Sequence, residues 1–127
     1  MRYYDVAVAS LAIHATPKWT DNLLSQHRLP DVVSERRGVA RRISHAGLVR
    51  LALIRQLHHG LGLGVGDAVR VAHQLLDSEG TAVYESGQLR LTIDLPALER
   101  ALDSRLAEVL ESAPATRRGR PPRTPGT

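Results

Sequence analysis

The sequence predicts a mainly helical chain that carries two small β-hairpins. Three observations support this prediction. Apolar residues recur every three or four positions in several segments, and Thr16-Pro17 places a capping side chain before a proline at the first helical position. Residues 81–94 instead alternate between apolar and polar types, as strands do. With 127 residues, 43% of them hydrophobic, the chain is long enough to bury a core.

Two short helices are predicted first. Small and apolar residues at 5–14 fit a first helix, and the second begins at Pro17 and ends near His27. Only three residues connect them, which is typical of a helix-turn-helix. Trp19, Leu23 and Leu24 are predicted to face inward. The polar residues expected to face outward are Lys18, Thr20, Asp21, Asn22, Ser25 and Gln26.

A basic hairpin is predicted next. Pro30 ends the second helix, Val32 and Val33 fit one strand, and Val39 and Ile43 fit the return strand, with Gly38 in the turn. The cations of this segment are Arg28, Arg36, Arg37, Arg41 and Arg42. A basic hairpin after a helix-turn-helix is typical of a wing.

Two further helices complete the front of the chain. Ser44 is predicted to cap a helix whose inward residues are Leu48, Leu51, Ile54, Leu57 and Leu61. The glycines between 60 and 66 predict a bend into a fourth helix. Its inward residues are Val65, Ala68, Val69, Ala72, Leu75 and Leu76.

Residues 77–112 are predicted to form a second unit, a β-hairpin followed by an acidic amphipathic helix. Glu85-Ser86-Gly87 is expected to be the turn, with Leu89, Leu91 and Ile93 on one face of the hairpin. The helix begins at Asp94-Leu95-Pro96, and its apolar stripe contains Leu95, Leu98, Leu102, Leu106 and Val109. Leu98, Leu102, Leu106 and Val109 are candidates for dimerisation; a lid over the core of residues 1–76 is the alternative, and the pattern does not separate the two.

Charge divides the chain in the same way. Residues 1–76 carry a net +5, residues 77–111 a net −5 and residues 112–127 a net +4. Of the 17 basic residues, all but Lys18 are arginines, which suits phosphate and guanine recognition, although a GC-rich genome produces the same bias. The tail at 113–127 is expected to be disordered.

The composition excludes several classes of function. Zero cysteine rules out disulfides, thiolate metal sites and a cysteine nucleophile. His58, His59 and His73 lack metal-ligand spacing, and no catalytic motif is present. We therefore expect no enzyme, no metal and no cofactor. The absence of a long apolar run predicts no membrane span. The absence of cysteine leaves the reducing cytoplasm as the expected location, at the nucleoid for a DNA-binding protein.

The order of these elements, with Arg41-Arg42-Ile43-Ser44 passing into "HAGLVRLALIRQL", resembles the MerR-type winged-helix DNA-binding domain over roughly residues 5–76. The chain has Ile43 where that family has an aromatic residue. The resemblance implies a homodimer on double-stranded DNA, with the helix from Pro17 in the major groove. Lys18, Thr20, Asn22 and Gln26 would then face base edges, and Arg28, Arg36, Arg37, Arg41 and Arg42 would contact phosphates.

The tail carries a second resemblance. Arg118-Gly119-Arg120-Pro121 is similar to the core of the AT-hook, which lies in narrow A·T minor grooves. Arg117, Arg118, Gly119, Arg120 and Arg123 are therefore candidate DNA contacts, unless the tail only aids solubility.

The sequence thus predicts a bacterial transcriptional regulator with no indicated small-molecule effector. The alternatives are a protein-interaction module that uses the acidic helix and a nonspecific architectural or phage accessory factor. The main prediction requires that the arginines at 36–42 and the outer face of residues 17–27 form one cationic surface.

Overall fold

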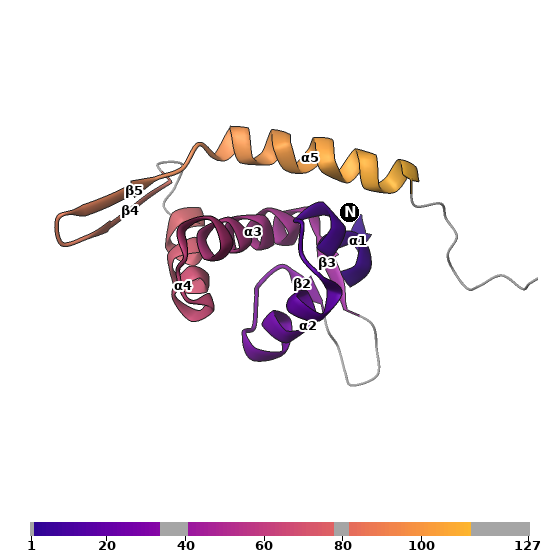
Figure 1. Ribbon diagram of the computed structural model, residues 1–127, viewed down its shortest axis with the longest axis horizontal. Coiled ribbons are helices and arrows are strands. Elements are labelled where there is room, and N and C mark those ends of the chain that lie inside the picture. The colour runs from indigo at the N-terminus through magenta and orange to yellow at the C-terminus, as the bar shows by residue number, and fades with distance from the viewer. Residues whose placement is uncertain (1, 34–40, 78–81, 113–127) are drawn as a thin grey trace, which may run out of the picture.

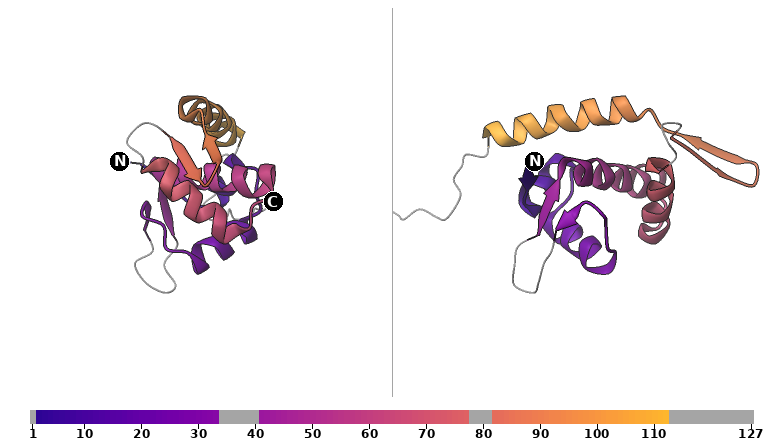
Figure 2. Two further views of the ribbon diagram at one scale, coloured as in Figure 1. Left: turned by 90° about the vertical axis from the view of Figure 1, so that its left-hand side faces the viewer. Right: turned by 180° about the vertical axis from the view of Figure 1, so that it is seen from behind.

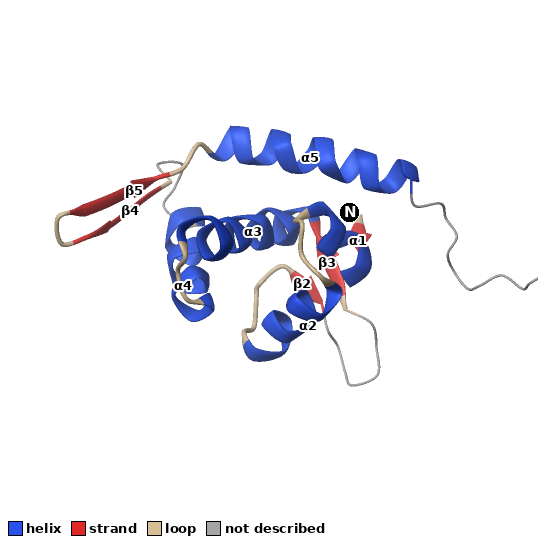
Figure 3. Cartoon of the chain, viewed as in Figure 1, coloured by secondary structure: helices blue, strands red, loops and turns tan. Residues whose placement is uncertain are grey.

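The computed structural model describes residues 2–33, 41–77 and 82–112. The protein is mainly helical, with one small antiparallel sheet and a separate two-stranded hairpin (Figure 1, Figure 3). The elements are β1 (Tyr3–Tyr4), α1 (Val6–Ala12), α2 (Pro17–Gln26), β2 (Val32–Val33), β3 (Arg42–Ser44), α3 (His45–Arg55), the π-helix η1 (Gln56–Gly60), α4 (Val65–Leu76), β4 (Val83–Ser86), β5 (Leu89–Thr92) and α5 (Leu95–Ser112).

Side-chain caps fix where four of the helices begin. Thr16 Oγ1 accepts a hydrogen bond from Trp19 N at 3.0 Å, and Pro17 occupies the first position of α2, as predicted. Ser44 Oγ caps α3 by accepting from Gly47 N at 3.1 Å, also as predicted. Asp5 and Asp94 cap α1 and α5 in the same manner. These local bonds satisfy backbone donors that would otherwise lack partners at the helix starts.

The small sheet has the order β1-β3-β2, with all neighbours antiparallel. Ile43 lies at its centre, opposite Tyr4 on one side and Val32 on the other, and it is fully buried. The two predicted wing strands therefore pair as expected at Val32, Val33 and Ile43. β1 was not predicted, because a two-residue strand is too short for alternation to be visible. Gly38 and Val39 lie outside the described residues.

α3 is the central helix of the core. Leu48, Leu51 and Ile54 are fully buried, as predicted, and α3 contacts α4, α5 and β3. The prediction for Leu61 was wrong, because its side chain is 61% exposed. The α-helix ends at Arg55, and the wider π-helical turn that follows changes the direction in which later side chains point.

α4 buries most of the residues predicted for its inner face. Ala68, Ala72 and Leu75 are buried, Val65, Val69 and Leu76 are half-buried, and Val71 is buried in addition. The helix packs against α3 and β4.

α5 packs along α1 and α3 of its own chain, on the side of the molecule opposite α2 (Figure 1, Figure 2). Leu102 and Leu106 belong to the main core, and Val109 is also buried. Leu98 is half-buried against the same core. α5 therefore packs as a lid over the core of its own chain, which is the second of the two predicted alternatives. The residues named as dimerisation candidates make their apolar contacts within one chain.

The β4–β5 hairpin projects beyond α4 (Figure 1). Its turn begins at Gly87, where φ is +63°. The turn was predicted at 85–87, but Glu85 and Ser86 belong to strand β4. Of the three residues predicted to share one face, Leu91 and Ile93 pack against the core, whereas Leu89 is 73% exposed. No helix within the described ranges is long and apolar enough to cross a membrane.

One polar contact joins this hairpin to α4. Arg70 Nη1 donates to the Tyr84 hydroxyl at 3.2 Å, and Arg70 Nη2 donates to Asp67 at 2.9 Å. The bond to Asp67, followed by the bond to Tyr84, raises the pKa of the Arg70 guanidinium.

Candidate nucleic-acid interface

α1 and α2 are joined by a tight turn at residues 13–16. His14 occupies the left-handed region with φ +59°, and Ala15 N donates to Ser10 O at 2.8 Å. Arg55 of α3 supports the turn from behind, since its Nη2 donates to the His14 carbonyl at 2.9 Å. The angle between the two helices is therefore held by contacts from both α1 and α3.

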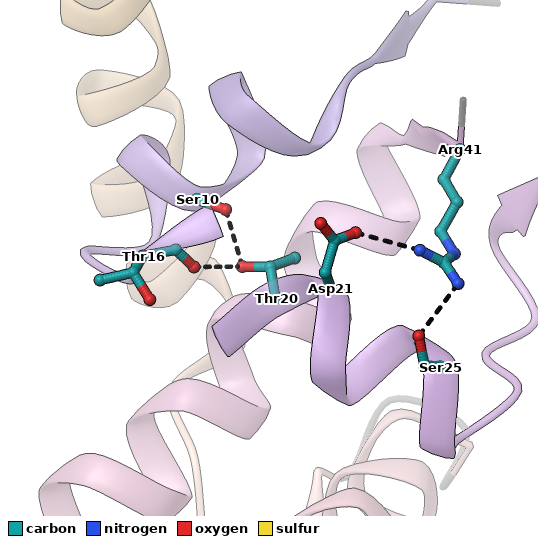
Figure 4. A network of polar contacts seen from close by, with 6 residues as sticks. All are labelled: Ser10, Thr16, Thr20, Asp21, Ser25 and Arg41. Carbon is teal, nitrogen blue, oxygen red and sulfur yellow. Dashed lines mark hydrogen bonds and ion pairs between the residues drawn. The ribbon is translucent and has the colours of Figure 1, made fainter. Parts of the chain in front are cut away.

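A buried pair of hydroxyls connects the same two helices. Ser10 Oγ donates to Thr20 Oγ1 at 2.7 Å, and Thr20 Oγ1 donates to the Thr16 carbonyl at 3.3 Å (Figure 4). Both Ser10 and Thr20 are fully buried. The prediction that Thr20 faces outward toward a base edge was wrong, because its side chain points into α1.

The remaining polar residues of α2 do face outward. The exposed residues along this helix are Pro17, Lys18, Asp21, Asn22, Ser25 and Gln26. Leu23 and Leu24 are buried, as predicted. Trp19 is half-buried: its ring stacks with the His58 ring at 6.0 Å and lies under the Arg55 guanidinium at 4.8 Å. α2 therefore has one polar face that is exposed to solvent and one apolar face that packs against the rest of the chain.

Arg41 connects the start of the return strand to this polar surface. Its Nη1 donates to Asp21 Oδ1 at 3.0 Å, and its Nη2 donates to Ser25 Oγ at 3.2 Å (Figure 4). Asp21 and Ser25 are one helical turn apart, so one planar guanidinium reaches both. The start of β3 and the outer face of α2 thereby form one continuous surface.

A groove of about 370 Å³ lies next to this contact. Arg28 and Arg41 both line it, together with Ser25, Gln26 and His27 at the end of α2. The polar lining contains two guanidiniums and one hydroxyl, which are the donors that phosphate oxygens accept from.

The side chain of Arg42 contacts strand β1. Successive residues of a strand point to opposite faces, so Arg42 is on the other face of β3 from Ile43. Its guanidinium lies 5.5 Å from the centre of the Tyr3 ring on β1. Arg42 thus contacts β1, whereas Arg41 is bonded to α2.

The pairing of Arg41 with Asp21 affects the charge of the surface. Their side chains are 26% and 53% exposed, so water screens the ion pair and it contributes at most about 1 kcal/mol. Such a pair can be exchanged for a contact between Arg41 and a phosphate at small cost. The Asp21 carboxylate holds Arg41 against α2 but also lowers the positive potential there.

Several predicted contacts fall on parts of the chain that the structure does not describe. These are Arg36, Arg37, Arg117, Arg118, Gly119, Arg120 and Arg123. Among the described residues, no group of three or more His, Cys, Asp or Glu side chains could hold a metal ion.

Sequence reasoning missed two residues that shape the interface. Ser10 reads as one more small residue of the first helix, and only its position opposite Thr20 shows its role. Arg55 is one polar residue at the end of the apolar helix α3, and only the tertiary fold shows its contacts with His14 and Trp19. No protein-family model, curated protein or solved structure matches this chain at a significant level.

Proposed function

We propose that this protein binds double-stranded DNA through a winged helix-turn-helix of the MerR type and acts as a bacterial transcriptional regulator. The observation that carries the proposal is the reach of Arg41 across to Asp21 and Ser25, which joins the wing strand to the exposed face of α2. A surface of this kind suits a duplex, because an α-helix fits the major groove while adjacent cations contact the phosphates.

Each part of the surface has a distinct role in this proposal. Lys18, Asn22 and Gln26 lie along the exposed face of α2 and would contact base edges; the amides of Asn and Gln pair well with adenine. Arg28 and Arg41, which line the groove beside α2, would hold a phosphate. The turn at His14 also supports the proposal, because helix-turn-helix units often need a residue there that tolerates positive φ.

The tail and the partner copy belong to the same proposal. A homodimer would place two α2 helices in successive major grooves and predicts a palindromic site. The α5 stripe is occupied within the chain, so the dimer would use another surface. The basic tail would add contacts in A·T-rich minor grooves.

The test is duplex binding as a function of salt. For each phosphate that a variant no longer neutralises, the slope of log affinity against log salt falls by about 0.9. Arg41→Gln should therefore lower the slope by about that amount, and Asp21→Asn should raise affinity severalfold by removing the only carboxylate from the exposed face of α2. Arg100→Gln, the same charge change on the exposed side of α5, is the matched control and should have no effect.

Selection of duplexes from a random pool identifies the mode of binding. A palindrome supports a dimeric regulator, and A/T-rich enrichment that disappears on removing residues 114–127 supports the tail as an AT-hook. Equal slopes for the original protein and Arg41→Gln would falsify the role of the wing strand. A stable complex with a protein partner that resists nuclease, with no duplex binding, would favour the interaction module instead.

A further inference from the structure

A second concave site lies under α5, separate from the α2 surface. It is an open cavity of about 420 Å³, a volume within the range of small-molecule sites. Its walls come from three regions: the end of α1 and its turn, the junction of α3 with η1, and the middle of α5. No sequence pattern indicated this cavity, because its three walls are far apart along the chain.

The cavity is lined by two kinds of side chain, apolar and basic. The apolar part is formed by Ala12, Ile13, Ala52, Leu98, Ala101 and Leu102. The ionisable side chains that line it are all basic: His14, Arg55, His59 and Arg105. Among the residues that the structure describes, no carboxylate lines the cavity, even though α5 is an acidic helix.

The two guanidiniums are held in place from opposite walls. Arg55, from α3, donates to the His14 carbonyl at 2.9 Å, and Arg105, from α5, donates through Nε to the Leu11 carbonyl at 3.3 Å. Each guanidinium has five N–H donors, so these bonds leave others for a ligand. Arg105 also lies 3.5 Å from Glu108, a distance too long for a strong pair. The two imidazoles can each donate a further N–H.

We propose that this cavity binds a small amphipathic carboxylate, with its charged group at Arg55 and Arg105 and its apolar body against Ile13, Leu98 and Leu102. Charge complementarity identifies the head group, because a carboxylate accepts two parallel bonds from a guanidinium. The apolar lining identifies the body, since a bare phosphate would leave that surface in water. The arginine-rich tail of the chain is not a suitable occupant, because it would bring like charge to the two guanidiniums.

Arg55 also connects the cavity with α2. Its guanidinium lies 4.8 Å from the centre of the Trp19 ring, and Trp19 belongs to α2. A carboxylate that draws Arg55 toward the cavity changes the contact with that ring. Trp19 is the single tryptophan of the chain, so its fluorescence reports occupancy directly.

The experiment titrates the full chain with octanoate and follows Trp19 fluorescence, without DNA. We expect a saturable change that 1-octanol and inorganic phosphate do not reproduce. Arg105→Gln should weaken octanoate binding at least about tenfold, because it removes a charge-assisted bond. Arg100→Gln, on the same helix but outside the cavity, should bind within about twofold of the original protein, as expected for a screened distant charge.

Two thermal unfolding measurements accompany the titration: one checks that the variant folds, and the other checks that octanoate binds the folded protein. Thermal unfolding of Arg105→Gln verifies that the variant folds; if it does not, His59→Ala at the exposed end of η1 replaces it and should also weaken binding. Octanoate should raise the unfolding temperature of the original protein, since a ligand that binds only the folded state stabilises it. Equal binding of octanol and octanoate, or equal binding by Arg105→Gln and Arg100→Gln, would overturn the proposal. Because DNA is absent, failure here leaves the duplex proposal unaffected.

Discussion

Ser10 and Thr20 form a side-chain bond in the interior that positions α2 on α1. Both hydroxyls are removed from water, and the bond between them satisfies the Ser10 donor. A buried donor that loses its partner retains its desolvation cost, whereas losing both partners together costs much less. The pair therefore orients the exposed face of α2 without contacting any ligand.

Thr20→Val tests this role. The substitution keeps the shape of the side chain but leaves the Ser10 hydroxyl buried without its partner, so we expect a loss of about 1–3 kcal/mol in the free energy of unfolding. The double variant Ser10→Ala/Thr20→Val should be less destabilised than the sum of the two single variants. Urea unfolding of all four proteins measures this coupling. Strict additivity would show that the two hydroxyls do not interact.

At the scale of an element, the start of α3 depends on a glycine. An added Cβ at Gly47 would lie 2.6 Å from the Asp31 carbonyl and 2.9 Å from Ile43 Cγ2. The same carbonyl accepts from Ser44 N and from Ser44 Oγ, both at 3.2 Å. The chain that enters β2 thus passes close to the first turn of α3, and no side chain fits between them.

Gly47→Ala should therefore destabilise the protein. Alanine is favoured over glycine within a helix by about 1 kcal/mol, but the clash with backbone outweighs this gain, and we expect a net loss of about 1–3 kcal/mol. Gly66→Ala, in the first turn of α4, is the matched control: nothing lies within 4 Å of its added Cβ, so stability should stay equal or rise. Thermal unfolding compares the two. A Gly47→Ala protein as stable as Gly66→Ala would contradict the close approach.

At the scale of the whole molecule, α5 packs over α1 and α3 and completes the hydrophobic core. Leu102 and Leu106 are 4% and 5% exposed, and they reach this burial without a second copy of the chain. The helix also provides one wall of the cavity through Leu98 and Arg105. α5 is therefore a part of the structural core.

Leu106→Ala tests this arrangement. Removing a buried leucine side chain should cost about 2–5 kcal/mol, through reduced burial and the space left behind. Because the contacts lie within one chain, the loss should be the same at two protein concentrations about 100-fold apart. Denaturant unfolding at both concentrations provides the measurement. A loss that grows with concentration would indicate that the stripe instead pairs two copies.

Local features of the sequence predicted most of the elements. Thr16-Pro17 and Ser44 specify helix starts through bonds within four residues, so they are visible without the fold. The apolar spacing likewise predicted the inner face of α3, continued as far as Leu57 in η1, and most of the inner face of α4. Prediction failed at Leu61, where a π-helical turn changes the periodicity, and at Thr20, where a polar residue finds a buried partner.

The amino-acid sequence by itself determined the number and order of the helices, the caps at Thr16 and Ser44, the pairing of Val32 and Val33 with the strand that contains Ile43, and the charge of each segment. Each of these depends on neighbours a few residues apart. Only the tertiary structure decided that α5 covers its own chain, that Arg41 reaches from the start of β3 to α2, and that Arg55 and Arg105 line one cavity. These results depend on which surfaces meet when distant segments pack. Burial and pairing of that kind depend on the whole fold, so no local pattern specifies them.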